Sequence, residues 1–240
     1  MIRTTIQAAA IALYTLAFAL ASIVLLILIP TGDPLLWMAR PWAWLILATF
    51  RVRIAASGAD RIPKNRPCIY MSNHQSHFDV PALIRVLPGQ YRILAKRELF
   101  FIPVFGWAIW LAGLIPVDRS RKERAVRSIE RAAEKVRRGR SILIFAEGTR
   151  SSDGALQPLK KGGFHIALRS GAAIVPICIR GSREVLPKGG IRINPGVIDV
   201  AILEPIETGS AGPRSIEGLV IRVREALEAG LRAGRAGDGT

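Results

Sequence analysis

The sequence is poor in acidic residues, cysteine and histidine. Its 240 residues hold 18 aspartates and glutamates against 34 lysines and arginines, so the formal net charge is +16. Such a balance is typical of proteins that meet nucleic acid, an anionic membrane surface or anionic substrates. The two cysteines, Cys68 and Cys178, each lie within an apolar run. This placement argues against a disulfide framework and indicates buried thiols in a reducing compartment, with Cys178 in the core rather than acting as a nucleophile.

Several sequence motifs of other enzyme classes are also absent. The chain has no Gly-x-Ser-x-Gly of the serine hydrolases, no Walker loop and no Gly-x-Gly-x-x-Gly after a predicted strand. His74, His77 and Asp79 lie close together, but no second cluster of histidine or cysteine supplies further ligands. A metal site is therefore disfavoured, and we expect no metal and no cofactor.

Charge is missing altogether from residues 4 to 32. As a helix, residues 6–29 would extend about 36 Å, enough to cross a hydrocarbon core of about 30 Å. The Ala-Leu-Ala at 19–21 resembles a signal-peptide cleavage site, but the apolar run continues well past it. A membrane anchor is therefore favoured over a cleaved secretory signal.

A second apolar stretch, at residues 35–50, differs from the first. It is interrupted by Arg40 and Pro41 and carries three tryptophans. The uninterrupted part is too short to span a bilayer, whereas indole rings and arginine both find partners at the membrane–water interface. We expect this stretch to lie at that interface.

Beyond residue 50, short strand-like runs alternate with helical patterns. Unbroken apolar runs at 141–146 and 172–179 are typical of buried parallel strands. Residues 121–138 have one apolar face and a basic remainder, as expected of an amphipathic helix. The alternation predicts an α/β fold with a mainly parallel sheet flanked by helices. Further strands are expected at 51–56, 68–72, 92–95, 114–117 and 196–203, and further helices near 80–87 and from 216 onward.

His74 and Asp79 lie five residues apart, just before a predicted helix. On a regular helix their side chains would be about 140° apart, so they can meet only if the chain turns between them. Ser76 and Asp79 match a capping box, and Pro81 suits a first helical turn. Asp79 therefore has two interpretations: a helix cap alone, or the partner of a loop histidine that acts as a base. His77 is expected to pack or cap nearby.

Polar residues also follow the first of the two unbroken apolar runs. Glu147, Gly148 and Arg150 lie at a tight turn, at the end of a strand where α/β proteins usually bind ligands. The arginine fork can bind phosphate in a bidentate manner, although the same residues would fit a solvated turn. A weaker copy, Asp118-Arg119, follows another predicted strand and could be a simple ion pair.

Six blocks of this sequence resemble the glycerolipid acyltransferase family, in its lysophosphatidic acid acyltransferase branch. NHQSHFD is similar to the His-x-x-x-x-Asp box of that family. His77 stands in it where a larger aromatic is common, and Ala146 stands where proline is common in a later block. The resemblance covers residues 50–205, with blocks in family order at 73–79, 95–107 (AKRELFFIPVFGW), 113–119 (GLIPVDR), 145–150 (FAEGTR), 159–168 (LKKGGFHIAL) and 175–189 (VPICIRGSREVLPKG).

The resemblance implies a reaction and a set of site residues. A fatty acyl group would pass from acyl-CoA or acyl-carrier protein to the sn-2 hydroxyl of lysophosphatidic acid, giving phosphatidic acid. His74 would be the general base, with Asp79 stabilising its imidazolium. A thiolate leaves readily, so the resemblance requires neither a covalent enzyme intermediate nor a metal. The residues implied in acceptor binding are Lys96, Arg119, Glu147, Gly148, Thr149 and Arg150.

The resemblance also organises the chain. We assign residues 1–50 to membrane-anchor helices, 51–208 to the acyltransferase catalytic domain, and 209–240 to a C-terminal amphipathic helix with a disordered tail. The expected location is the cell membrane, with the catalytic domain on the cytoplasmic side. Acyl thioesters are made there, and the positive-inside tendency retains a basic domain there. We expect an anionic membrane surface as a partner and no nucleic acid.

Two alternatives stay open. The acceptor could be another lysolipid, such as a lyso-ornithine lipid. The chain could also be a non-catalytic basic protein that holds anionic lipid, although this would leave six ordered blocks unexplained. No cluster of aromatics that could cage a choline head group accompanies Arg119 or Arg150, which favours a phosphate-bearing acceptor.

Overall fold

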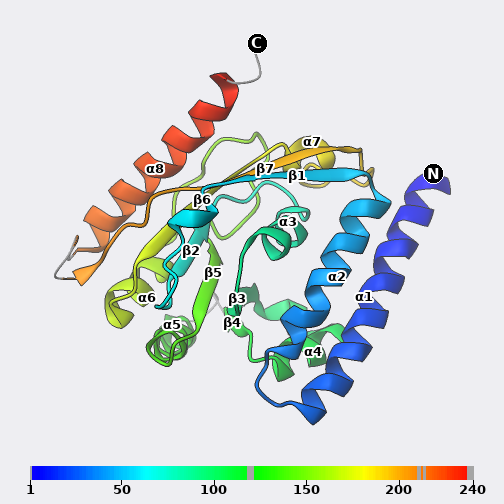
Figure 1. The fold of residues 1–240 in the computed structure, drawn as a ribbon, viewed down its shortest axis with the longest axis horizontal. Coiled ribbons are helices and arrows are strands. Elements are labelled where there is room, and N and C mark those ends of the chain that lie inside the picture. The colour runs from blue at the N-terminus through cyan, green and yellow to red at the C-terminus, as the bar shows by residue number, and fades with distance from the viewer. Residues whose placement is uncertain (1, 118–121, 210–211, 213–214, 237–240) are drawn as a thin grey trace.

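The computed structural model describes residues 2–117, 122–209, 212 and 215–236, so the expected Asp118-Arg119 turn lies outside the described residues. The central sheet is made of strands β1 (Val52–Ser57), β2 (Ile69–Ser72), β3 (Tyr91–Lys96), β4 (Ile115–Val117), β5 (Ser141–Phe145), β6 (Ile174–Arg180) and β7 (Gly196–Ile202). These seven strands lie in the order β1-β7-β6-β2-β5-β3-β4 (Figure 1).

Five of the six neighbouring strand pairs are parallel, and only the β6–β7 pair is antiparallel. The prediction of a mainly parallel sheet is confirmed. Because β6, β2, β5, β3 and β4 all run in one direction, their carboxyl ends meet at one edge of the sheet, where α/β proteins bind ligands.

Helices cover both faces of this sheet. Leu47 and Leu83 belong to a buried cluster on one face, while Val136, Phe164 and Val223 belong to a second cluster on the other. Each such buried side chain contributes about 1.5–3 kcal/mol relative to exposure. The helices are α1 (Ile2–Leu28), α2 (Pro34–Thr49), α3 (Asp79–Val86), α4 (Phe105–Leu111), α5 (Lys122–Arg137), α6 (Gly162–Ser170), α7 (Ser182–Val185) and α8 (Ile216–Ala236), with 3-10 turns η1 (Ala59–Arg61) and η2 (Arg97–Phe101).

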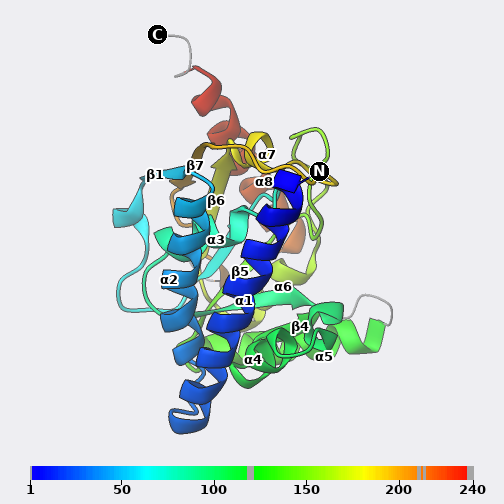
Figure 2. The same ribbon diagram turned by 90° about the vertical axis from the view of Figure 1, so that its right-hand side faces the viewer.

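The first helix lies outside the central layers, against α2 and α4 (Figure 2). Near its start, the Gln7 side chain donates to the carbonyl of Ile193 (3.1 Å) and accepts from its N–H (3.4 Å). Just beyond its end, the Arg92 guanidinium donates to the carbonyl of Thr31 (3.0 Å) and to Asp33 (3.1 Å). The chain is therefore tied to the main domain at both ends of α1, so the helix runs alongside that domain.

The outer side of α1 remains apolar. By length and composition, Thr4–Leu28 could cross a membrane. α1 is therefore a candidate membrane anchor, docked on the main domain through its polar contacts. Its exposed large apolar side chains are Ile6, Leu13, Leu16, Leu20, Val24, Ile27 and Leu28.

The second apolar stretch forms α2, which continues through Pro41. Arg40 donates to the carbonyl of Gly89 (2.7 Å), so this helix also contacts the main domain. Trp37 and Trp44 are exposed, as an interfacial position requires, whereas Trp42 donates to the hydroxyl of Thr15 on α1 (3.2 Å).

The last helix extends further than predicted. The Ala/Gly/Arg segment expected to be disordered continues α8 as far as Ala236. Alanine, leucine and arginine all favour helices, and Gly230 packs closely on β6: a Cβ at this glycine would lie 3.2 Å from that of Cys178. The disorder prediction was wrong up to residue 236, and residues 237–240 lie outside the described part of the chain.

Candidate active site

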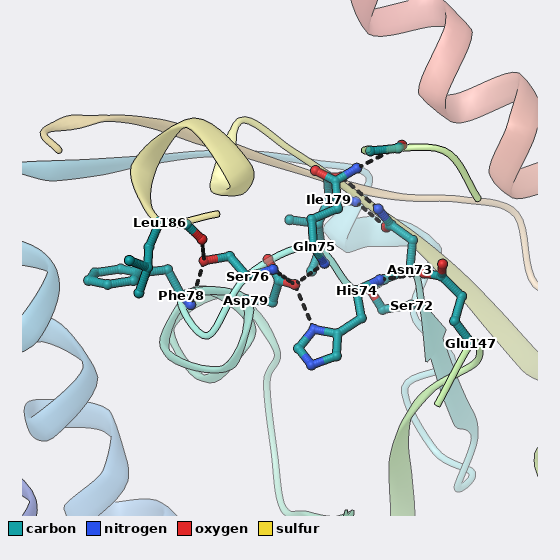
Figure 3. A network of polar contacts seen from close by, with 11 residues as sticks. Ser72, Asn73, His74, Gln75, Ser76, Phe78, Asp79, Glu147, Ile179 and Leu186 are labelled. Atoms are coloured by element: carbon teal, nitrogen blue, oxygen red, sulfur yellow. Dashed lines mark hydrogen bonds and ion pairs between the residues drawn. The ribbon is translucent and has the colours of Figure 1, made fainter. Parts of the chain in front are cut away.

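The candidate site begins where β2 ends and the chain turns toward α3 (Figure 3). Asn73 is buried here and pairs with β6: its amide donates to the carbonyl of Ile179 (2.8 Å) and its carbonyl accepts the N–H of Ile179 (2.7 Å). The Asn73 side chain thus pairs with the backbone of β6 in the way that a neighbouring strand would. This pairing fixes the point at which His74 emerges at the carboxyl edge.

One oxygen of Asp79 makes three short contacts. Oδ2 lies 2.7 Å from Nδ1 of His74 and accepts the backbone N–H groups of Gln75 (2.7 Å) and Ser76 (2.9 Å). Asp79 thus satisfies amides before the helix and also pairs with the histidine, so it is more than a helix cap. Since the carboxylate accepts, the pairing favours the tautomer that carries its proton on Nδ1. Nε2 is then the nitrogen available as a base.

The capping box is present in a modified form. The Ser76 hydroxyl accepts the N–H of Phe78 (3.1 Å) rather than that of Asp79, and it donates to the carbonyl of Leu186 (2.7 Å). His77 does not have the packing or capping role expected of it. It is exposed and has no hydrogen bond with the described residues, because Ser76 and Asp79 already satisfy the neighbouring amides.

The His74 ring stacks on Phe145, with ring centroids 3.8 Å apart and an interplanar angle of 18°. Its side chain is 15% exposed, so it is confined but accessible. Figure 3 shows the second ring nitrogen turned away from Asp79, and within the described part of the chain Nε2 has no hydrogen-bond partner. The imidazole is therefore held at one nitrogen and open at the other.

The loop between β5 and α6 holds the backbone of His74. Oε1 of Glu147 accepts the N–H of His74 (2.7 Å), and Oε2 accepts the N–H of Gln157 (2.8 Å). The Ser151 N–H in turn donates to the carbonyl of His74 (2.7 Å). Both polar backbone groups of His74 are thus bound by this one loop.

Glu147 is itself only 1% exposed. Burial raises the pKa of this carboxyl, and the N–H groups of Gln157 and His74 partly oppose that rise. Because main-chain amides occupy both oxygens, the geometry differs from the direct acceptor contact that the sequence implied. Each carboxylate oxygen is thus bound by the protein's own backbone.

The rest of the turn is more open. Gly148 has a φ of 71°, which favours glycine, and its N–H donates to the carbonyl of Phe145 (3.0 Å). Thr149 is exposed and Arg150 is partly exposed. Although much of the His77 side chain is exposed, desolvation of its covered part and then the charge of Arg150 lower its pKa, so Arg150 lies within electrostatic range of the loop that carries His74.

Lys96 lies apart from this group. Lys96 ends β3, next to β5 at the same edge, but it is 73% exposed and pairs with Glu98 (3.4 Å). Arg119 lies outside the described residues. The structure therefore brings His74 and Asp79 together with the 147–150 turn, and it leaves Lys96 on the surface beside an acid.

Sequence reasoning missed the residues that support the site. Asn73 stands inside the recognised box, but its partner Ile179 is far away in the chain. Ser151 and Gln157 act through backbone N–H groups, which any residue except proline provides. Their residue types therefore gave no signal. Among the described residues, no group of three histidine, cysteine, aspartate or glutamate side chains could hold a metal.

This chain is similar to known acyltransferases in sequence and in fold. The family model described as Acyltransferase matches residues 53–180. The chloroplastic 1-acyl-sn-glycerol-3-phosphate acyltransferase BAT2 of Brassica napus is 35% identical over 207 residues, covering 80% of this chain and 60% of that protein. The alpha enzyme of Homo sapiens is 34% identical over 179 residues, covering 74% of this chain and 63% of the relative.

Two further similarities extend over more of the matched protein. An uncharacterized acyltransferase of Schizosaccharomyces pombe is 31% identical and is covered to 70%. The crystal structure of the 1-acyl-sn-glycerophosphate acyltransferase PlsC from Thermotoga maritima superposes with a TM-score of 0.82 at 25% identity, covering 97% of this chain and 95% of that one. The chain nevertheless spans only about half to two thirds of the length of the first curated relatives it matches.

Proposed function

Because this chain belongs to the acyltransferase family, we propose that it transfers a fatty acyl group from an acyl thioester to the sn-2 hydroxyl of lysophosphatidic acid. The product would be phosphatidic acid. The observation that carries this proposal is the 2.7 Å contact between His74 Nδ1 and Asp79 Oδ2, made at the ligand edge of the sheet with Nε2 left open. The relatives from Brassica napus, Homo sapiens and Thermotoga maritima are named for this acceptor, which supports the proposal.

The proposed chemistry needs one proton acceptor. Nε2 of His74 takes the proton of the sn-2 hydroxyl while that oxygen attacks the thioester carbonyl. The tetrahedral intermediate then expels the thiolate, and the imidazolium can return its proton to the sulfur. Asp79 stabilises the imidazolium, and the N–H groups of Gln75 and Ser76 keep its oxygen in place. Because a thiolate leaves readily, neither a covalent enzyme intermediate nor a metal is needed.

In this proposal Glu147 is a positioning residue rather than an acceptor ligand. Its two oxygens accept the N–H groups of His74 and Gln157, so it connects the catalytic loop to the β5–α6 loop. Charge-assisted hydrogen bonds of this kind contribute about 1.5–3 kcal/mol. Loss of one oxygen acceptor would let the imidazole shift relative to the hydroxyl that it must deprotonate.

The acceptor phosphate would be bound by Arg150, which has no hydrogen bond or ion pair with the described residues. A guanidinium fork matches the oxygens of a phosphomonoester. Gly148 would give the turn its shape, and Thr149 would offer an exposed hydroxyl. We propose that Arg119 and Lys96 assist at the same phosphate, Lys96 after giving up its exposed pair with Glu98.

The donor is proposed to be acyl-CoA or acyl-carrier protein, and the enzyme is proposed to work at an anionic membrane surface from the cytoplasmic side. The apolar α1 and the net charge of +16 support a membrane location. The alternative acceptor, a lyso-ornithine lipid, lacks the phosphomonoester that would use the Arg150 fork.

An acyl-transfer assay tests the proposal. The purified full chain would be offered an acyl thioester with lysophosphatidic acid, lysophosphatidylcholine or a lyso-ornithine lipid, beside His74→Ala. We expect lysophosphatidic acid to be preferred by at least about tenfold in kcat/KM, equivalent to about 1.4 kcal/mol. Equal rates on all acceptors would leave only a general acyltransferase. No transfer to any acceptor would favour the non-catalytic lipid-binding alternative.

A further inference from the structure

A second feature lies away from the reaction site, at the free edge of the sheet beyond β4. It is a pocket of about 320 Å³ formed by η2, α4, β4 and α5. Since β5 and β3 separate β4 from β2, the pocket is on the order of 14 Å along the sheet from the strand that leads to His74. The residues that matter here are Arg97, Phe101, Trp110, Arg124, Arg127 and Arg131.

The pocket is strongly basic. Arg124, Arg127 and Arg131 follow the helical spacing of one face of α5, and Arg97 joins them from η2, with its guanidinium carbon 5.5 Å from the centre of the Phe101 ring. Among the described residues that line it there is no aspartate or glutamate. Four guanidinium groups around one pocket repel one another, so an anion bound there would be stabilised by all of them.

Two acidic residues of α5 pair with arginines outside the pocket. Glu130 pairs with Arg137 (3.2 Å) and also with Arg169. Glu134 pairs with Arg137 (2.7 Å) and Arg138 (2.7 Å). These carboxylates are engaged by other arginines, none of which lines the pocket. Arg127 and Arg131 make no ion pair with the described residues, so their charge is available to an anion in the pocket.

The aromatic residues of the pocket are exposed: Phe101 and Trp110 are each 69% exposed. Trp107, one helical turn before Trp110 on α4, is 59% exposed, and Ile102, next to Phe101 in the chain, is 46% exposed; together they form an aromatic rim. α4, which carries the two tryptophans, packs against α1, whose outer side is apolar. A basic pocket bordered by tryptophan, next to a candidate membrane anchor, has the composition of a membrane–water interface.

We propose that this pocket binds the phosphate head group of an anionic membrane lipid while Trp107, Trp110 and Phe101 enter the acyl-chain boundary. Free phosphate would use the arginines alone and would leave the exposed aromatic rim without a role, so the lipid is the better match. The lipid here is distinct from the acceptor. It docks the β4 edge of the domain on the bilayer as a second attachment besides α1 and α2.

Lipid-selective quenching of tryptophan fluorescence tests this proposal. The full chain would be reconstituted into phosphatidylcholine vesicles containing either dibrominated phosphatidylglycerol or dibrominated phosphatidylcholine. Basic residues attract anionic lipid strongly, so half-maximal quenching should need at least about fivefold less of the brominated anionic lipid. Equal quenching by the two lipids in the wild type would overturn the proposal.

Paired variants locate the effect. Arg127→Gln/Arg131→Gln should abolish the preference, whereas Arg127→Lys/Arg131→Lys keeps the charge and should retain most of it. Arg222→Gln/Arg232→Gln removes the same charge from exposed positions on α8, on the opposite side of the molecule from α4 (Figure 1), and should leave the preference intact. A preference that survives Arg127→Gln/Arg131→Gln would also overturn the proposal.

Two controls separate this pocket from other parts of the protein. Trp107→Phe/Trp110→Phe should remove the selective part of the signal; if the selectivity persists, it comes from Trp37 or Trp44 on α2 and the proposal fails. His74→Ala should keep the lipid preference, and Arg127→Gln/Arg131→Gln should keep acyl transfer to detergent-dispersed lysophosphatidic acid. Failure of the proposed reaction and failure of the lipid pocket are thereby distinguishable.

Discussion

At the scale of single residues, the proposed chemistry depends on one carboxylate oxygen that holds both the start of a helix and an imidazole. Oδ2 of Asp79 meets Nδ1 of His74 and two backbone N–H groups, while Oδ1 is buried without a hydrogen-bond partner in the described part of the chain. Three contacts on one oxygen leave that oxygen little freedom to move. The imidazole is therefore oriented before substrate arrives.

We predict that His74→Ala lowers kcat at least about 100-fold, because general-base catalysis typically contributes 10²–10⁴-fold. Asp79→Asn should cost nearly as much, since an amide cannot stabilise the imidazolium. Steady-state acyl transfer measures both. His77→Ala removes an exposed histidine from the same loop and serves as the control, with kcat expected within about tenfold of the wild type. Residual activity of His74→Ala within tenfold of the wild type would mean that another group is the base.

The variant Glu147→Gln tests whether Glu147 positions the loop that carries His74. The amide keeps one oxygen acceptor but turns an NH₂ group toward a backbone N–H that the carboxylate now binds. We predict that kcat falls at least about tenfold, or about 1.4 kcal/mol, while KM for lysophosphatidic acid changes little. A large rise in the acceptor KM with kcat retained would instead restore a direct contact between Glu147 and the acceptor.

The same variant has a predicted pH dependence. Burial raises the pKa of Glu147 above its ordinary value of 4.5. The folded state therefore holds the carboxyl proton of Glu147 more tightly than the unfolded state does. The stability contributed by this titration is present at low pH and is lost as pH rises through the folded pKa. Glutamine does not titrate. The destabilisation caused by Glu147→Gln should therefore shrink between pH 4 and pH 7, as measured by melting temperature; a destabilisation that grows over this range would contradict it.

Arg150→Lys keeps the charge and loses the fork. We predict that it raises KM for lysophosphatidic acid by about tenfold or more while leaving KM for the acyl donor within about twofold, since one bidentate interaction is removed from the acceptor side only. Initial rates with each substrate varied in turn provide the measurement. A defect confined to the donor KM would remove Arg150 from the acceptor site.

At the scale of secondary-structure elements, much of the architecture was predictable because its signals are local. The unbroken apolar runs that became β5 and β6 indicated buried parallel strands, and their polar ends indicated the ligand edge. The site was predictable where neighbours in sequence are also neighbours in space, as for His74 and Asp79. Glu147 was placed in the right turn, but its orientation depends on a contact with a loop 73 residues earlier, and no local pattern encodes it.

The attachment of α1 is another long-range feature of this kind. Asp33, in the turn between α1 and α2, accepts from Arg92 (3.1 Å) and Arg140 (2.8 Å), and Arg92 is almost completely buried. Burial lowers the pKa of Arg92, and the hydrogen bond to Asp33 opposes this. Asp33 therefore compensates the charge of the Arg92 guanidinium, which would be costly to bury without a partner.

We predict that Asp33→Ala lowers the free energy of unfolding by about 3 kcal/mol, because it leaves the buried guanidinium of Arg92 with less compensation. Asp60→Ala removes an exposed acid from η1 and should change the stability by no more than about 0.5 kcal/mol. Denaturant unfolding of the detergent-solubilised protein compares the two. Equal stabilities would mean that Arg92 is satisfied by the carbonyls of Tyr91 and Thr31 alone.

At the scale of the whole molecule, the polar contacts at both ends of α1 restrict how the protein meets a membrane. Gln7 is held by Ile193, and the turn after α1 is held by Arg92. While these contacts last, α1 stays packed against α2 and α4, so its apolar outer side, the exposed tryptophans of α2 and the aromatic rim beside α4 are presented together. Attachment then combines apolar insertion, which salt does not weaken, with basic residues, whose attraction salt screens.

This division predicts how attachment responds to truncation and salt. The full chain should stay on anionic vesicles in about 1 M salt, where the Debye length is only about 3 Å. A chain lacking residues 1–33 should bind at low salt through α2 and the basic surface and be released at high salt. Co-sedimentation measures both. Release of the full chain by salt would remove α1 as the anchor.

The orientation of the main domain is a separate prediction. Protease should cut this domain in inside-out vesicles and leave it intact in right-side-out vesicles, since a basic domain is retained on the cytoplasmic side. Protection of the domain in inside-out vesicles would reverse the proposed orientation.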